Sequence, residues 1–527
     1  MGCSAESGLR RGIQAVRTGT PTRDHDRRSF RRRLARAIRE TLLLCIVLMR
    51  AVAASPSELP KYFVTFDSQM ERAEVKLCLD RAHSRVEFSP DSPRAMQYLS
   101  GMRRSGAGDL DTASSPWRAR NWRAGECLAY SADIGAIADQ HSDSGTRYGS
   151  NIVTDPQHWL LHADAQGARG AEATIELPEG WSISAPWHEL SRDGKSIRFQ
   201  IPDTPLDWSA SLVLGHFEEA RIELPGGTLR VAMLINDDSQ RQKLAGWMRR
   251  VGQALLTAYG RLPIADTQVW LVSIDNLSIP ARFFAFLHPG AVLDGESARG
   301  QGNALHLDID PTRPEGEFLE DWTAVHELSH LLHPYLGDRG SWLGEGLATY
   351  YQNVLRARAG LLTPRQAWQR LASGFQRGQS GPYAESLEQA AADMSQSHAF
   401  LRVYWSGAAY WLIVDAELRR LSRGKQSLDT ALSRFGDCCL PAYREWKPED
   451  FVAKLDAVAG VKIFTQHYRE FARMKRFPDW QESFARLGVE ASEDFVTFDE
   501  GAPDAWIRAA ITAPRASTDL VRATKPD

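Results

Sequence analysis

Two histidines four residues apart, in His326-Glu327-Leu328-Ser329-His330, constrain this chain more than any other feature of its sequence. Residues at positions i and i+4 lie on one face of a helix, about one turn apart, so both imidazoles can bind one zinc ion. Apolar residues recur around them at roughly helical spacing, at Phe318, Trp322, Val325 and Leu332. The pattern predicts a zinc-binding helix that ends before Pro334; the alternative is a buried helix that carries two histidines by chance.

A catalytic zinc site needs a third protein ligand and an open fourth position. Glu345 follows in Trp342-Leu-Gly-Glu-Gly346, which we predict to open a second helix that runs to Gly360, with Glu345 in its first turn. Glycine costs about 1 kcal/mol in a helix interior, so the glycines beside Glu345 favour close packing against another helix. The alternative is a glutamate favoured by the helix dipole. We interpret His326, His330 and Glu345 as ligands of one Zn²⁺ ion.

Residues 317–440 resemble the gluzincin metallopeptidases, and most closely the glycyl aminopeptidase family. The segments that carry the resemblance are the HExxH motif, Trp342–Gly346, Tyr350-Tyr351, Arg358–Thr363, Tyr404–Asp415 and Gly424–Asp429. The resemblance implies a β domain at the N-terminus, a thermolysin-like catalytic domain and a helical domain that closes the cleft. The implied activity is zinc-dependent hydrolysis of peptide bonds, aminopeptidase-like, with endopeptidase activity as an alternative.

Two residues are expected to act in that reaction. Glu327 is placed to take a proton from zinc-activated water and to pass it to the leaving amine. Tyr404, in Tyr404-Trp-Ser-Gly407, matches a family tyrosine that points at the reacting carbonyl, although the family often has Lys where Ser406 stands. The alternative for Tyr404 is a helix-surface or core aromatic. A non-catalytic protein that binds peptides or a partner is the rival function, and a purely structural zinc site would need a fourth protein ligand.

The residue that would recognise a substrate's free amino group is not evident. Aminopeptidases of the group carry a glycine-rich segment ending in glutamate before HExxH, and residues 288–308 hold no clean match. Glu296, Asp308 and Asp310 are the candidates, each with a surface or turn role as the alternative. The choice between aminopeptidase and endopeptidase therefore stays open.

The periodicity of the sequence predicts an α+β, multidomain protein. We expect an N-terminal all-β, sandwich-like domain over residues 55–225 and the thermolysin-like catalytic domain over 226–362, with a helix near 239–259. A mostly helical domain follows over 363–475, and a tail of mixed structure over 476–527. The polar stretch 101–150 lacks periodicity and is interpreted as loops.

Residues 1–54 are interpreted as an export segment. Residues 1–53 carry twelve arginines and four acidic residues, an apolar run follows at Thr41–Met49, and small residues come next at 51–54. The run is short for a membrane span of roughly 20 residues, so we expect a periplasmic or secreted protein, with a tether by an uncleaved signal as an alternative.

Export fits what the rest of the chain contains. Without residues 1–53 the formal charge of −3 becomes −11, which argues against nucleic acid as a partner and leaves a peptide or protein substrate. An oxidising compartment permits disulfides. We favour Cys78 with Cys127, while Cys438 and Cys439 either form a vicinal bridge or stay reduced.

Overall fold

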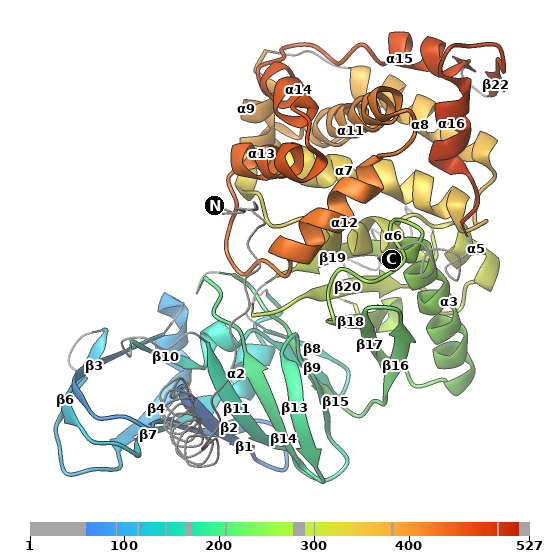
Figure 1. Ribbon diagram of the computed structural model, residues 1–527. Helices are drawn as coiled ribbons and strands as arrows, with labels where there is room; N and C mark the ends of the chain where they lie inside the picture. Colours follow the sequence, from blue (N-terminus) through green and yellow to red (C-terminus); the bar gives the residue numbers. More distant parts are fainter. Residues whose placement is uncertain are drawn as a thin grey trace, which may run out of the picture. The chain divides into compact units, whose positions relative to one another are not determined.

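The computed structural model describes residues 59–515 apart from 91, 113–114, 143–144, 165–169, 206–207, 278–289, 300, 381–383 and 493–494. The predicted export segment lies outside these residues. In the described part, strands dominate the N-terminal half and helices the C-terminal half, as the sequence predicts (Figure 1). No helix in the described ranges is both long and apolar enough to cross a membrane.

The N-terminal half is built on a seven-stranded sheet of order β13-β14-β11-β1-β2-β7-β4. Its strands are, in that order, His188–Asp193, Ser196–Ile201, Ala171–Glu176, Lys61–Phe66, Arg72–Leu79, Glu126–Asp133 and Leu99–Arg104. Buried and exposed residues alternate along β1, β2 and β14, which is why their sequences reveal strands. The buried side chains meet in one apolar core.

Two four-stranded sheets complete this half. The first has the order β10-β3-β6-β5, with strands Leu161–Asp164, His83–Pro90, Trp117–Trp122 and Leu110–Asp111. The second has the order β12-β15-β9-β8, with strands Ser182–Ser184, Leu212–Gly215, Asn151–Thr154 and Gly145–Tyr148.

The interpretation of residues 101–150 as loops is wrong. The stretch contains β5, β6, β7, β8 and a short helix, α2 (Ile134–Ala138). In β6 the side chains of Trp117, Ala119 and Trp122 are buried, whereas Arg120 and Asn121 between them are exposed. These strands are short and carry charged residues on one face, so their average polarity hides their alternation.

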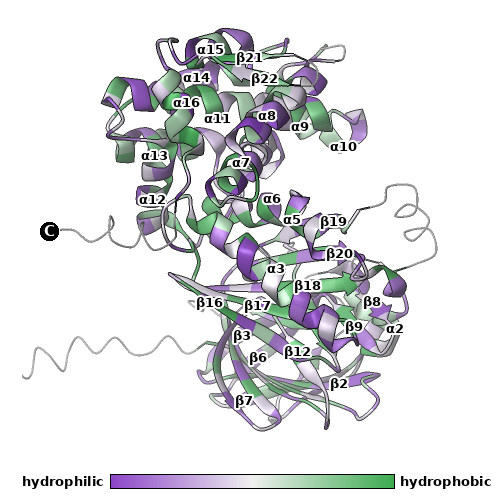
Figure 2. Ribbon diagram, turned by 90° about the vertical axis from the view of Figure 1, so that its right-hand side faces the viewer, coloured by the Kyte–Doolittle hydropathy of each residue, from purple (hydrophilic) through white to green (hydrophobic). Residues whose placement is uncertain are grey.

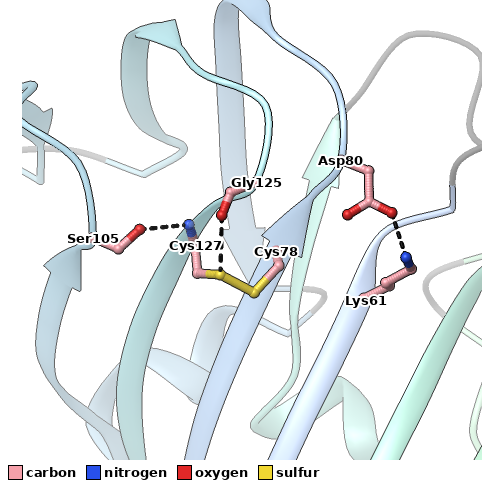
Figure 3. The surroundings of a disulfide bond; sticks show 6 residues. All are labelled: Lys61, Cys78, Asp80, Ser105, Gly125 and Cys127. Carbon is pink, nitrogen blue, oxygen red and sulfur yellow. Dashed lines mark hydrogen bonds and ion pairs between the residues drawn. A yellow bond between two sulfur atoms is a disulfide. The ribbon is translucent and has the colours of Figure 1, made fainter.

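The predicted bridge between Cys78 and Cys127 is confirmed. The two cysteines lie directly opposite each other on the paired strands β2 and β7 (Figure 3). The backbone N–H of Cys127 donates to Ser105 Oγ at 2.8 Å, which links the bridge to the chain after β4. Cys438 and Cys439 are also joined to each other.

A five-stranded mixed sheet of order β16-β17-β18-β20-β19 begins the second half. Its strands are Glu219–Leu224, Gly227–Leu234, Asp266–Ser273, Ala304–Ile309 and Val292–Ala298. Strands β16 and β17 form a hairpin, and the domain boundary predicted at residue 226 falls inside it. Helix α3 (Asp238–Leu256), close to the predicted 239–259, buries its apolar face against the sheet. Strand β19 is antiparallel to β20 and forms one edge.

Helices then follow almost to the end of the described chain. They are α5 (Glu315–Glu320), α6 (Thr323–Ser329), α7 (Gly337–Arg358), α8 (Pro364–Gln379), α9 (Leu387–Ala392), α10 (Met394–Ser397), α11 (Phe400–Ser422), α12 (Leu428–Cys439), α13 (Pro448–Ala459), α14 (Ile463–Ala472), α15 (Trp480–Leu487) and α16 (Ala505–Thr512). Hydrophobic residues line most of α11, which runs through the core of this half (Figure 2). The tail includes a small hairpin, β21 (Val489–Ala491) and β22 (Val496–Phe498).

Helices α7 and α11 cross in close contact (Figure 1). A side-chain carbon added at Gly346 would clash with the backbone of Gly407, and one added at Gly407 would clash with the carbonyl of Trp342. Backbones can approach this closely only where both residues lack a Cβ, so the predicted packing role of a glycine beside Glu345 is confirmed. The crossing places the helix of Glu345 against the helix of Tyr404.

Candidate metal centre

Helix α6 brings His326, Glu327 and His330 together. The helix is short and continues as a 3₁₀ turn, His330–Leu332, before the chain extends toward Pro334. The three side chains are buried, and each offers one ligand atom within 4.8 Å of the other two. Among the described residues, these three form a compact group of side chains of types that bind metal ions.

Glu345 completes the group from helix α7. Its Oε2 atom lies 3.2 Å from Nε2 of His326 and 3.5 Å from Nε2 of His330. Tetrahedral zinc with bonds of about 2.0–2.2 Å separates its ligand atoms by roughly 3.3–3.6 Å, and both distances lie close to that range. Because one oxygen of Glu345 reaches both imidazoles at these distances, Glu345 is a candidate for the third ligand beside Glu327, which belongs to the compact group with the two histidines.

Glu345 does not lie in the first turn of its helix, as the sequence suggested. Helix α7 begins at Gly337, which places Glu345 just over two turns inside. The dipole of a helix acts mainly within its first turn, so the alternative of a dipole-favoured glutamate loses its basis. A different contact favours glycine at position 344, because a Cβ there would lie 2.8 Å from Cε1 of His333.

Hydrogen bonds fix the orientation of both imidazoles. Nδ1 of His326 donates to Oε1 of Gln352 at 2.8 Å. His333 donates from Nδ1 to the carbonyl of Pro334 at 2.7 Å, which leaves its Nε2 as an acceptor for Nδ1–H of His330 at 3.1 Å. In the neutral form of each ring, these bonds place the proton on Nδ1 and leave Nε2, the atom nearest Glu345, free to bind a metal ion. Outer partners of this kind hold metal-binding histidines in many sites.

The electrostatics of the two glutamates differ. Burial alone would raise the pKa of Glu345, but His330 and His326, in their protonated forms, outweigh it by charge and by hydrogen bonds and hold that pKa well below its usual range. Burial raises the pKa of Glu327; the two imidazoles oppose this, and the carboxylates of Glu345 and Glu296 add to it. Glu345 is thus set up as a permanent carboxylate, and Glu327 as a group that can hold a proton.

Tyr404 reaches the same cluster from helix α11. Its ring is stacked near His326, with centroids 5.9 Å apart and an interplanar angle of 16°. Burial raises the pKa of its hydroxyl, and the carboxylates of Glu345, Glu327 and Asp294 raise it further. The hydroxyl therefore stays protonated and can donate a hydrogen bond beside the three metal-facing atoms.

The three candidates for an amine-binding residue separate in the structure. Asp308 lies 2.9 Å from Nε2 of His306, whose ring stacks on Trp270, and Asp310 accepts from the N–H of Thr312 in the turn after β20. Glu296, by contrast, lies on edge strand β19, close enough to Glu327 to raise its pKa.

Asp294, which the sequence did not single out, accompanies Glu296 on β19. Both side chains are exposed, and Asp294 is close enough to Tyr404 to raise the pKa of the hydroxyl. Gly295 between them packs on helix α6, where an added Cβ would lie 3.2 Å from Cγ of Glu327. The edge strand therefore gives an acidic border to the cluster.

The outer partner of His326 was also missed. Thr349 and Gln352 both lie on the helix face of Glu345, and Gln352 makes the contact. Positions i+4 and i+7 share a helix face with position i, so the signal was present. The longer side chain of Gln352 reaches Nδ1 of His326, and the buried hydroxyl of Thr349 makes no hydrogen bond with the described residues.

Comparisons with known proteins support the resemblance seen in the sequence. A family model described as M61 glycyl aminopeptidase matches residues 333–410, which include Glu345 and Tyr404. An aminopeptidase N family protein from Idiomarina loihiensis shares the fold, with a TM-score of 0.59 and 14% identity over 83% of this chain and 82% of that chain. The resemblance to gluzincin metallopeptidases is thereby confirmed.

Two further solved structures are similar at a lower level. Native yeast LTA4 hydrolase gives a TM-score of 0.49 and 13% identity, over 80% of this chain and 68% of that chain. The M1 zinc metallopeptidase from Deinococcus radiodurans gives a TM-score of 0.48 and 16% identity, over 80% of this chain and 95% of that chain. No curated protein matches the sequence.

Proposed function

We propose that this protein is a zinc-dependent peptidase of the gluzincin type, with a thermolysin-like catalytic domain built on β16–β20 and helices α6 and α7. One observation carries the proposal: Oε2 of Glu345 lies 3.2 Å from Nε2 of His326 and 3.5 Å from Nε2 of His330, close to the spacing of ligands on tetrahedral zinc. Glu327 lies in a compact group with the two histidines, and we assign it the role of general base and not of a fourth ligand.

The residues around the proposed metal site have separate roles in hydrolysis. When bound, Zn²⁺ makes a water molecule acidic enough to supply hydroxide near neutral pH and polarises a carbonyl group. Glu327 accepts the proton of the attacking water and delivers it to the leaving amine. Tyr404 donates a hydrogen bond to the carbonyl oxygen as negative charge grows on it. Gln352 and His333 hold the two imidazoles in the metal-binding orientation.

The edge strand β19 supplies the substrate's backbone contacts. Its outer side is not paired with another described strand, so an extended peptide can add to the sheet there by main-chain hydrogen bonds. Asp294 and Glu296 place negative charge along this strand, which attracts the ammonium group of a free peptide N-terminus. We therefore favour aminopeptidase action over endopeptidase action.

The deciding experiment combines metal analysis with peptide hydrolysis on the purified chain. The Glu327→Gln variant is expected to retain about one zinc per chain and to lose about 10²–10⁴-fold in kcat, the usual contribution of general acid–base catalysis. Glu315→Gln, an exposed exchange of the same type on helix α5, is the matched control and should behave like the wild type. A wild-type chain that binds zinc but cleaves no member of a peptide library would instead support a non-catalytic binding protein.

A second comparison separates the two kinds of peptidase. Wild-type protein should cleave peptides with a free N-terminus and spare their N-acetylated forms. The Asp294→Asn/Glu296→Gln double variant should reduce that preference about tenfold or more, because it removes the negative charge that the ammonium group faces. Equal cleavage of free and acetylated peptides by the wild type would establish an endopeptidase.

A further inference from the structure

A pocket opens beside the metal cluster, on the side of His326. It has a volume of ≈ 540 Å³ and lies between helices α7, α8 and α11. Tyr404 forms part of its wall, and so does Trp322, whose ring lies 5.4 Å from the ring of His326. The outer partner of His326, Gln352, lines it as well. A group bound in this pocket therefore lies next to the reacting centre.

The pocket combines exposed apolar side chains with two arginines, of which Arg377 lies over the ring of Trp405, 5.5 Å from its centroid. Trp322, Phe400 and Leu401 on its rim are 41%, 39% and 53% exposed, which is unusual for side chains of this size. Arg370 and Arg377 line it from helix α8, two turns apart on one face. Neither guanidinium forms an ion pair with the described residues, and no acidic side chain is among the described lining residues.

The floor of the pocket also holds an unused polar group. Thr349 is 2% exposed, and its hydroxyl has no hydrogen-bond partner among the described residues. A buried hydroxyl without a partner costs free energy, which a ligand that binds it recovers. Asp321 feels the charge of Arg370, but it accepts a hydrogen bond from the N–H of Thr323 at 2.7 Å and does not line the pocket.

The two sides of the cluster therefore carry opposite charge. The carboxylates of Asp294 and Glu296 lie along β19, whereas the arginines Arg370 and Arg377 lie across the pocket on α8. A peptide is positive at its N-terminus and negative at its C-terminus. Such an arrangement of charge favours a peptide whose amine lies toward β19 and whose following residues lie toward α8.

We propose that the pocket is the subsite for the residue after the scissile bond, and that Arg370 and Arg377 select substrates with a carboxylate there. The proposal rests on the peptidase function proposed above. The carboxylate comes from an acidic side chain or from the free C-terminus of a short peptide. Guanidinium groups suit both, because their paired donors match the two oxygens of a carboxylate.

Three peptides test the subsite and separate the two sources. Ala-Glu-amide carries only the side-chain carboxylate, Ala-Gln carries only the terminal one, and Ala-Gln-amide carries neither. We expect kcat/KM to be at least about tenfold higher for one or both charged peptides than for Ala-Gln-amide at low salt. The preference should fall as salt is added, because both arginines are reached by solvent.

In the Arg370→Gln/Arg377→Gln variant, the ratio of kcat/KM for a charged peptide to kcat/KM for Ala-Gln-amide should fall close to one. Arg249→Gln/Arg250→Gln is the matched control, since it removes the same charge from the exposed face of α3 and should leave the ratio unchanged. The single variant Arg377→Gln, at an exposed position, should lower the ratio partway even where the double variant folds poorly. Equal rates for all three peptides, or a preference that survives the loss of both arginines, would overturn the proposal.

Calorimetric binding of the same peptides to the zinc-loaded Glu327→Gln variant distinguishes this subsite from the catalytic proposal. A preference in binding that depends on the arginines, without hydrolysis by the wild type, would keep a carboxylate-binding pocket but overturn both the peptidase and the assignment of the pocket to the residue after the scissile bond. Hydrolysis by the wild type without any preference would overturn the subsite and keep the peptidase.

Discussion

Helix α7 carries two buried clusters of charged side chains, about 20 Å apart along its axis, and their charges are balanced in different ways. At Glu345, one carboxylate oxygen lies 3.2 Å and 3.5 Å from two imidazole Nε2 atoms, and all three are atoms of types that bind zinc. At Arg358, guanidinium and carboxylate groups alternate. Asp429 Oδ1 lies 2.9 Å from Arg358, and its Oδ2 lies 2.9 Å from Arg515 and 3.4 Å from Arg419.

The second cluster, which we call the arginine–aspartate network, also binds the helices together. Asp415 on α11 accepts from Arg419 and from the hydroxyl of Tyr350, and Asp429 on α12 accepts from the hydroxyl of Tyr351. Its ion pairs hold α7, α11 and α12 in one arrangement. The cluster at Glu345 lies beside a pocket, and the buried guanidinium of Arg299 is close enough to Glu345 and Glu327 for their charges to raise its pKa against the effect of burial. The arginine–aspartate network thus consists of ion pairs between helices, whereas the cluster at Glu345 gathers the ligand types of the proposed zinc site.

Removal of one member should damage the arginine–aspartate network most. Asp429→Asn keeps the shape of the side chain but leaves buried guanidinium groups without their counter-charge, so we expect a loss of about 3–5 kcal/mol in the free energy of unfolding. Chemical denaturation measures this loss, and zinc content per folded chain should not change. Asp437→Asn on the same helix is the control, since its ion pair with Arg261 is exposed and worth less than about 1 kcal/mol.

The contribution of Asp429 to the free energy of unfolding should depend on pH. Burial acts to raise the pKa of Asp429, but Arg358, Arg515 and Arg419 outweigh it and lower that pKa below its unfolded value of about 3.9. The stabilisation is therefore present above about pH 4 and is lost as the pH falls further. The unfolding free energies of wild type and Asp429→Asn should converge below pH 4. A constant difference down to pH 2 would show that charge is not the cause.

The next largest effect is expected at the reacting centre. Tyr404→Phe should lower kcat about 10²–10³-fold, or about 2.7–4 kcal/mol, with KM and zinc content nearly unchanged, because it removes a donor used in the transition state. Tyr410→Phe is the matched control on the same helix. Its hydroxyl donates to the carbonyl of Phe464 at 2.9 Å, so its loss should cost stability, about 1 kcal/mol, and not rate. If Tyr410→Phe lowered kcat and Tyr404→Phe did not, the role of hydrogen-bond donor to the carbonyl oxygen would pass to Tyr410.

These contrasts show which parts of the centre the sequence reveals. His326 and His330 were predicted from the geometry of a single helix, and Glu345 from the glycine-flanked segment that follows, which the family resemblance then supports. Glu345 was nevertheless placed in the first turn, because no capping residue marks the start of α7 at Gly337. The same is true of the fold. Strands in which buried and exposed residues alternate regularly, such as β1 and β14, were predicted, whereas the arginine-rich strand β6 was not.

Contacts between distant elements account for the rest. Asp294 and Tyr404 come from different ends of the catalytic half, and their proximity depends on how β19 and α11 pack. Arg370 and Arg377 look like the solvated face of an ordinary amphipathic helix until α8 lies beside Tyr404. Charge in a sequence reveals no site by itself, because its meaning depends on whether a partner of opposite charge folds against it.

The smallest of the expected effects tests whether the hydrogen bonds behind the imidazoles matter. Gln352→Met removes the acceptor for Nδ1 of His326 and keeps the side chain close in size, so zinc affinity should fall about 10–100-fold. Competition with a chelator of known affinity measures the change. Gln352→Glu is the rescuing variant, since a carboxylate accepts the same hydrogen bond and makes the imidazole a stronger ligand. If both variants bind zinc as the wild type does, the cluster at Glu345 is held by packing alone, and the contrast between the two ends of α7 loses its basis in hydrogen bonding.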